Sequence, residues 1–246
     1  MSSLSSDILI NPQDLYDITV AGTANTGGVF GDGAQLGALA TTGDGRYFRY
    51  AYAGAVALVP GTLLQAPIEV TGSQNLAVAA AAIGATSVTT TSTVTCSAND
   101  FAGGWIMVTT SAGVGYQYQI ASHAAASGAV VTLYLADPLV VALTTGSRID
   151  LVSNPFYKVI INPSAATSCP VGAAVAATPI NYYGWVQTKG VACVLADGTV
   201  TVGTTVVASN ATAGAVEAFT GVQAVVGIAV TGIATTEYGA INLNLP

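Results

Sequence analysis

The feature that most constrains the fold is a strand-like alternation that recurs along almost the whole chain. Runs of β-branched and aromatic residues, each roughly five to ten residues long, are separated by clusters of Gly, Asn, Asp and Ser, a pattern typical of strands joined by turns. The runs are 86–96, 105–109, 114–120, 129–135, 184–188, 191–195, 199–202, 205–208, 224–230 and 239–245. The sequence therefore predicts an all-β fold made of β-barrel or β-sandwich domains.

Local signals refine this expectation at three places. Asp197-Gly198 stands between the apolar runs 191–195 and 199–202, and Asp-Gly in this position predicts a tight hairpin. A short helix is expected at 11–16, where an Asn precedes a Pro at the first helical position. The alanine-rich stretch 76–83 is too short and too apolar on all sides for an amphipathic helix, and it stays unassigned.

Charge excludes several classes of partner. Only 7% of the residues are charged, and five Lys and Arg stand against twelve Asp and Glu, which gives a net charge of −7. A nucleic-acid binder needs basic residues to neutralise phosphates, so no nucleic acid is expected. The chain also has neither a secretory leader pattern nor an apolar run that spans a bilayer, so we expect a cytoplasmically made product without a membrane partner.

Groups that catalyse reactions are scarce. His123 is the only histidine, and its Ala- and Ser-rich surroundings predict an exposed or turn histidine. No G-x-S-x-G elbow accompanies it, and no phosphate-binding glycine loop occurs. The chain is therefore not expected to be an enzyme or to bind a cofactor.

Cysteines and acidic turns give no metal-binding pattern. Cys96, Cys169 and Cys193 are widely spaced and are expected to be small buried residues with free thiols, a Cys169–Cys193 disulfide being the alternative. The acidic Gly-Asp-Gly turns and Asp197-Gly198 are expected to be simple turns, with calcium ligation as the alternative. No metal site is predicted.

Tyr116 and Tyr118 are two residues apart, so on a strand they project from the same face. Such a pair packs in a core, contacts another subunit, or stacks on a glycan, and the sequence leaves these alternatives open.

Composition divides the chain into three parts. Residues 1–44 are largely Gly-rich and aperiodic, which predicts an extended N-terminal arm. A weak similarity between 52–63 and 189–200 suggests one discontinuous β domain, 45–71 with 156–246. The intervening 72–155 is then an inserted β domain.

Several segments together resemble the head decoration, or cement, proteins of tailed bacteriophages. These segments are Gly45–Pro67, Ala82–Thr89, Tyr116–Ile120, Asp137–Leu139 and Tyr183–Gly190. The resemblance extends in style over residues 45–246 and leaves 1–44 uncovered. It implies a protein without an active site that binds the outer surface of the virion head, contacts the major capsid protein, forms a homotrimer and stabilises contacts between capsomers.

From this resemblance we derive an interface hypothesis. The arm would supply apolar contacts to the capsid or to a neighbouring subunit, and two arginines would pair with capsid carboxylates. The residues are Ile8, Leu9, Ile10, Leu15, Tyr16, Val29, Phe30, Arg46 and Arg49. The alternatives are a glycan-binding or receptor-binding module that uses Tyr116 and Tyr118, another virion structural protein, and a secreted β-sandwich enzyme.

Overall fold

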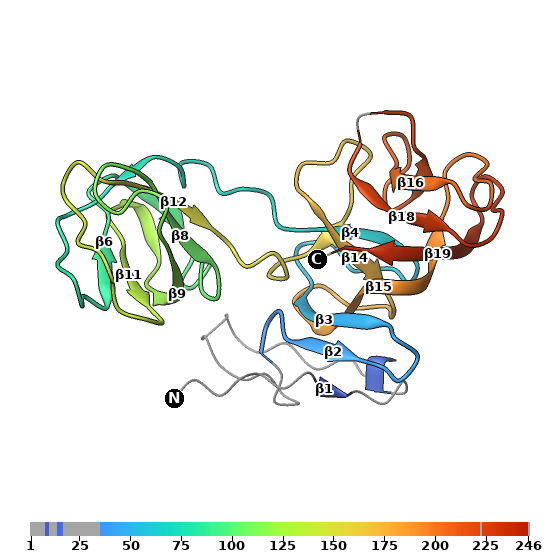
Figure 1. Cartoon of the computed structure of the whole chain (residues 1–246), viewed down its shortest axis with the longest axis horizontal. Helices are drawn as coiled ribbons and strands as arrows, with labels where there is room; N and C mark the ends of the chain where they lie inside the picture. The colour runs from blue at the N-terminus through green and yellow to red at the C-terminus, as the bar shows by residue number, and fades with distance from the viewer. Residues whose placement is uncertain (1–7, 10–13, 17–34, 222, 246) are drawn as a thin grey trace. The chain divides into compact units, whose positions relative to one another are not determined.

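The structure is a computed structural model that describes residues 8–9, 14–16, 35–221 and 223–245 (Figure 1). Apart from a three-residue 3-10 helix, η1 (Asp14–Tyr16), the regular elements in these residues are strands, which curl into antiparallel half-barrels. The predicted all-β class is confirmed. No helix in these ranges has the length and apolar character needed to cross a membrane.

The chain divides into two compact units. Unit 2 is Glu69–Asn154, and unit 1 contains the described residues up to Ile68 and from Pro155 onwards. The inserted domain expected at 72–155 has borders within a few residues of this unit. The borders fall where the chain passes from one hydrophobic cluster to another.

Unit 1 is built on an 11-stranded sheet. Its path is β1-β2-β3-β15-β19-β18-β16-β17, with β4, β13 and β14 joined beside it. Their bounds are β1 (Ile8–Leu9), β2 (Leu39–Thr41), β3 (Tyr47–Tyr52), β4 (Leu63–Gln65), β13 (Ile160–Ile161), β14 (Pro170–Ala174), β15 (Tyr183–Leu195), β16 (Thr205–Ala208), β17 (Val216–Ala218), β18 (Val225–Ala229) and β19 (Tyr238–Asn244). β15 is one long strand, whereas the sequence analysis expected two shorter ones.

Unit 1 contains the same four-strand arrangement twice. In half A, β4 pairs with β14, β14 with the first part of β15, and that part with β3. In half B, β16 pairs with β18, β18 with β19, and β19 with the second part of β15. The registers correspond, because the pair Leu64–Gly172 in half A matches the pair Val206–Gly227 in half B.

Each half is closed by two turns that face each other through a mutual pair of backbone hydrogen bonds. Leu58 and Thr178 form this pair in half A, at 2.8 and 3.1 Å, and Val200 and Ile233 form it in half B, at 2.9 and 2.8 Å. The third residue of the turn after each bridge has a positive φ, as type II turns require. These residues are Gly61 (77°), Asn181 (63°), Gly203 (79°) and Thr236 (64°).

The repeat corrects two local predictions. The similarity between 52–63 and 189–200 lies in the wrong register, because the turn that matches Pro60-Gly61 is Val202-Gly203. The Asp197-Gly198 hairpin is also wrong: β15 pairs with β19 and β3, and Val200 bridges Ile233. Asp197-Gly198 is instead a bend between β15 and the next turn. No local hairpin forms, because the backbone groups on either side of it make hydrogen bonds with residues distant in the sequence.

Unit 2 has a six-stranded sheet, β5-β12-β8-β9-β11-β6, and a two-stranded one, β10-β7. Their bounds are β5 (Leu76–Ala77), β6 (Ser87–Thr89), β7 (Val94–Cys96), β8 (Trp105–Thr110), β9 (Gln117–His123), β10 (Ala126–Ala129), β11 (Thr132–Leu135) and β12 (Arg148–Val152). A mutual bridge between Ala81 and Leu143 again joins two turns. The expected strand 86–96 is two strands, β6 and β7, which pair with different partners.

Parts of the expected arm contribute to unit 1. β1 pairs parallel with β2, and β2 pairs antiparallel with β3. Leu15 of η1 is buried beside Phe48, Tyr50 and Trp185. The expected helix 11–16 is described only over η1. The rest of 1–34 lies outside the described residues.

Candidate binding groove on unit 1

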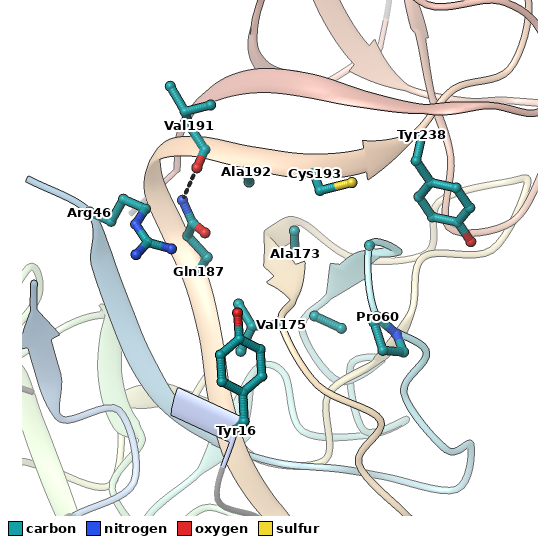
Figure 2. A pocket seen from close by; sticks show the side chains of 12 residues that line it. Tyr16, Arg46, Pro60, Ala173, Val175, Gln187, Val191, Ala192, Cys193 and Tyr238 are labelled. Carbon is teal, nitrogen blue, oxygen red and sulfur yellow. Dashed lines mark hydrogen bonds between the residues drawn. The ribbon is translucent and has the colours of Figure 1, made fainter. Parts of the chain in front are cut away.

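A pocket of about 240 Å³ lies on unit 1 beside the second part of β15 (Figure 2). We call it the β15 groove, and its lining includes Tyr16, Arg46, Gly61, Gln187, Cys193 and Tyr238. A neighbouring hollow of about 530 Å³ shares Arg46 and Val191 with it. Residues of η1, β14, β15, β19 and the Pro60-Gly61 turn, with Arg46 directly before β3, thus line one recess.

Gln187 shapes the groove by holding a bend in β15. Its Nε2 donates to the carbonyl oxygens of Lys189 at 3.1 Å and Val191 at 3.0 Å, and the second bond is drawn in Figure 2. The pairing of β15 with β3 shifts register between Gln187 and Lys189. Gly190 follows with φ of 84°, and a Cβ there would come within 2.9 Å of Cγ of Arg46. The bend therefore needs the Gln187 amide and the missing side chain of Gly190.

Arg46 brings a positive charge to the groove. Its Nε lies 2.8 Å from Oδ2 of Asp44, and its guanidinium lies 5.4 Å from the centre of the Phe48 ring. A hydrogen bond from the Thr42 hydroxyl, followed by the Arg46 contacts, lowers the pKa of the exposed Asp44 carboxyl. Asp44 is thus an ionised partner that orients Arg46, and the turn around it is held by Thr42 and Arg46.

Two exposed tyrosines flank the groove. Tyr16 is 62% exposed and Tyr238 is 50% exposed. Tyr16 is positioned by its neighbour Leu15, which anchors η1 in the aromatic cluster of Phe48, Tyr50 and Trp185. Exposed aromatic rings around a concave, partly apolar surface are typical of sites that bind another protein or a ligand.

The structure brings together two of the nine residues in the interface hypothesis, Tyr16 and Arg46. Ile8 and Leu9 belong to β1, and Arg49 donates to the carbonyl of Gly37 at 3.1 Å, away from the groove. Leu15 is buried. The remaining three, Ile10, Val29 and Phe30, lie outside the described residues.

Tyr116 and Tyr118 do not form one exposed face. Tyr118 is 6% exposed and belongs to the core of unit 2, whereas Tyr116 precedes β9 and is 46% exposed. The alternation of side chains within β9 turns Tyr118 towards the core, whereas Tyr116 comes before the first residue of the strand. Of the three alternatives, core packing holds for Tyr118.

His123 is buried, which corrects the expectation of an exposed or turn histidine. It ends β9, its Nε2 accepts the N–H of Phe101 at 3.0 Å, and its Nδ1 lies 2.8 Å from the carbonyl of Ala124. Burial lowers the pKa of His123 below its usual 6.5. The ring is a structural hydrogen-bonding group that ties the segment before β8 to β9.

The cysteine expectation is wrong for two of the three. Cys96 is buried, but Cys169 and Cys193 are exposed, and all three thiols are free. Cys193 stands between Ala192 and Val194, and its sequence neighbours do not show that its side chain faces outward from β15.

No group of three or more His, Cys, Asp or Glu in the described ranges is placed to hold a metal ion. Sequence reasoning missed Gln187, Cys193 and Tyr238 as groove residues. Gln187 and Cys193 lie in runs that predict a strand and Tyr238 directly precedes one, and no local signal distinguishes a residue that faces a groove from one that faces the core.

Comparisons of this chain with protein-family models, with curated proteins and with solved structures found no match.

Proposed function

We propose that this chain is a capsid decoration, or cement, protein that binds the outer surface of a bacteriophage head and docks through the β15 groove of unit 1. The observation that carries the proposal is the groove itself, which Tyr16, Arg46 and Tyr238 line together. The resemblance of 45–246 to decoration proteins supports the same class.

The physical basis of docking is the combination of apolar and charged groups at the groove. Exposed Tyr16, Tyr238 and Val191 lose contact with water when a partner covers them, which favours binding by roughly 25 cal/mol for each Å² of apolar area. Arg46 pairs with a carboxylate of the major capsid protein and sets the orientation. As a homotrimer, the protein would contact several capsomers at once, and the gain in effective concentration would stabilise the shell.

The first test is binding to heads of the phage that encodes the chain, prepared without the protein and mixed with purified protein before sedimentation. We expect the wild-type chain to sediment with the heads and Arg46→Glu to lose about tenfold or more in affinity. Arg148→Glu in unit 2 makes the same change in charge and serves as the control. A wild-type chain that stays in the supernatant, or is recovered only with tails, refutes the proposal.

The second test concerns the homotrimer. Light scattering during size-exclusion chromatography, at several concentrations, is expected to give three times the chain mass of 24.4 kDa. A monomer at every concentration would contradict a trimer formed before docking.

A further inference from the structure

The two halves of unit 1 differ in what covers one strand edge. In half A the outer edge of β3 is fully paired. Tyr52 exchanges hydrogen bonds with Phe156 and Val159, at 2.9 Å each, and Tyr50 donates to Ala38 at 3.0 Å and accepts from Gly37 at 2.8 Å. β2 and the residues before it thus add a strand to β3.

The second part of β15 takes the place of β3 in half B. The pair Tyr183–Tyr52 matches the pair Tyr238–Leu195, so Leu195 corresponds to Tyr52 and Cys193 to Tyr50. Leu195 donates to the carbonyl of Gly61 at 2.9 Å, on the edge that faces away from β19.

Backbone groups alternate between the two edges of a strand, so the N–H and C=O of Cys193 face the same edge as those of Leu195. In the described part of the chain, neither group of Cys193 has a hydrogen-bond partner on that edge. Val191, two residues earlier, has only its carbonyl engaged there, by Nε2 of Gln187. This open edge lies along the β15 groove, which Val191 and Cys193 both line (Figure 2).

We propose that the β15 groove is a strand-accepting slot, in which the edge at Val191–Cys193 pairs with an extended segment of the capsid protein, antiparallel to β15. This inference rests on the proposed function and adds the chemistry of the partner. Main-chain hydrogen bonds to a sheet edge supply affinity without regard to side chains, and the neighbouring pockets supply specificity.

The occupant has two chemical requirements. It needs small residues opposite Cys193, because the corresponding positions in half A are Gly37 and Ala38 and because Gly61 and Ala173 wall the groove. It also needs a carboxylate towards the Gly190 end, where Arg46 lies. Among the residues that the structure describes, the guanidinium of Arg46 has a hydrogen-bond partner only at Nε, which donates to Asp44, so its terminal N–H groups are available to a second carboxylate. In an antiparallel strand this acidic residue follows the small ones.

A proline at Cys193 tests the slot directly. Cys193→Pro removes the outward N–H, and proline is tolerated on an edge where that N–H makes no ladder bond. We expect Cys193→Pro to bind heads about tenfold more weakly than Cys193→Ala, which removes the same thiol but keeps the N–H. Equal binding of the two variants overturns the slot. If Cys193→Pro alone becomes monomeric while Cys193→Ala stays trimeric, the occupant is a second copy and the assignment to the capsid protein fails.

A peptide probe gives a readout that needs no heads and no proline variant. The peptide has the chain's own sequence Gln35–Asp44, which holds the Gly-Ala pair and a later carboxylate. At millimolar concentration it is expected to slow alkylation of Cys193 several-fold and to leave exposed Cys169 of the same molecule unchanged. The same peptide with Leu39→Pro is the control.

No difference between the two peptides overturns the slot. Protection of Cys193 by the first peptide, together with wild-type chain that fails to sediment with heads, leaves the slot standing and refutes the capsid as its occupant. The two failures are therefore distinguishable.

Discussion

At the scale of single residues, both ring nitrogens of His123 are engaged by backbone groups. Nε2 accepts from Phe101, so the proton of the neutral ring is on Nδ1, which donates to Ala124. The groups that face the ring are Asp100, which favours the charged form, and the buried Cys96 thiol, 3.9 Å from Nδ1. A second proton on Nε2 would point at the N–H of Phe101, so that two donors would face each other without an acceptor. Burial and this geometry both favour the neutral ring.

Unit 2 should therefore lose stability as the solution becomes acidic. The folded pKa of His123 lies below the unfolded value of 6.5, so the unfolded chain binds more protons between these values and stability rises with pH there. The stabilisation is complete above 6.5 and is lost as pH falls towards the folded pKa. Each pKa unit between the two states is worth about 1.4 kcal/mol.

Urea unfolding at pH 7.5 and 5.5 measures this effect. In a Trp185→Phe background the emission comes from Trp105 of β8, which reports on unit 2. We expect the midpoint to fall at pH 5.5 in this background and to stay constant when His123→Gln is added. Because His123 is the only histidine, an equal fall in both proteins would contradict its role.

Gln187 is the second residue with a specific expected effect. Gln187→Leu keeps a side chain of similar size but leaves the carbonyls of Lys189 and Val191 without their donor. We expect unit 1 to lose about 1–2 kcal/mol of unfolding free energy, measured by Trp185 fluorescence in a Trp105→Phe background. Gln119→Leu, at an exposed position of β9 in unit 2, should leave that transition unchanged.

At the scale of elements, the four turns of unit 1 share one backbone geometry but not one residue type. Gly61, Asn181 and Gly203 suit the left-handed conformation of the third turn position, whereas Thr236 adopts it with a β-branched side chain. Such a residue carries strain of about 1 kcal/mol or more. The repeat thus identifies Thr236 as the strained member.

Thr236→Asn is expected to stabilise unit 1 by about 0.5–1 kcal/mol, because asparagine tolerates the left-handed region. Thermal unfolding followed by near-ultraviolet circular dichroism measures the change. Thr235→Asn, one position earlier, is the control and should bring no gain. A Thr236→Asn protein that melts at or below the wild-type temperature would show that the threonine is not strained.

Strands were predictable where the sequence signal is local. They were missed where pairing between distant strands decides the structure. The alternation in 105–109 and 129–135 predicts most of β8 and all of β11, because successive side chains of a strand face the core and the solvent in turn. Asp197-Gly198 has a hairpin signal, yet β15 pairs with β19. Leu39–Thr41 gives no strand signal amid its glycines and forms β2 because the edge of β3 is available.

At the scale of the whole molecule, the two units have separate hydrophobic clusters. The cluster of unit 2 includes Phe101, Ile106, Leu133 and Ile149, and it is drawn from 76–151. Antiparallel pairing of β5 with β12 brings the two ends of unit 2 together, and the Leu151 N–H donates to Ser73 at 2.9 Å. A unit with its own core and joined ends has the properties of an autonomous domain.

Residues 69–154 expressed alone are therefore expected to fold, with a cooperative urea transition and the same His123-dependent loss of stability at pH 5.5. Trp105 is the only tryptophan of this fragment and reports on both. A fragment without a cooperative transition would show that unit 2 depends on the rest of the chain.

The sequence by itself determined the all-β class, because alternation and turn residues act over a few neighbours. It also determined the low charge that leaves Arg46 as one of only five basic residues. The tertiary structure decided the β15 groove, the burial of His123, the exposure of Cys193 and the repeat that relates Cys193 to Tyr50. These depend on which distant strands exchange backbone hydrogen bonds. All backbone groups are chemically alike, so the choice among strands is made by the packing of the whole core.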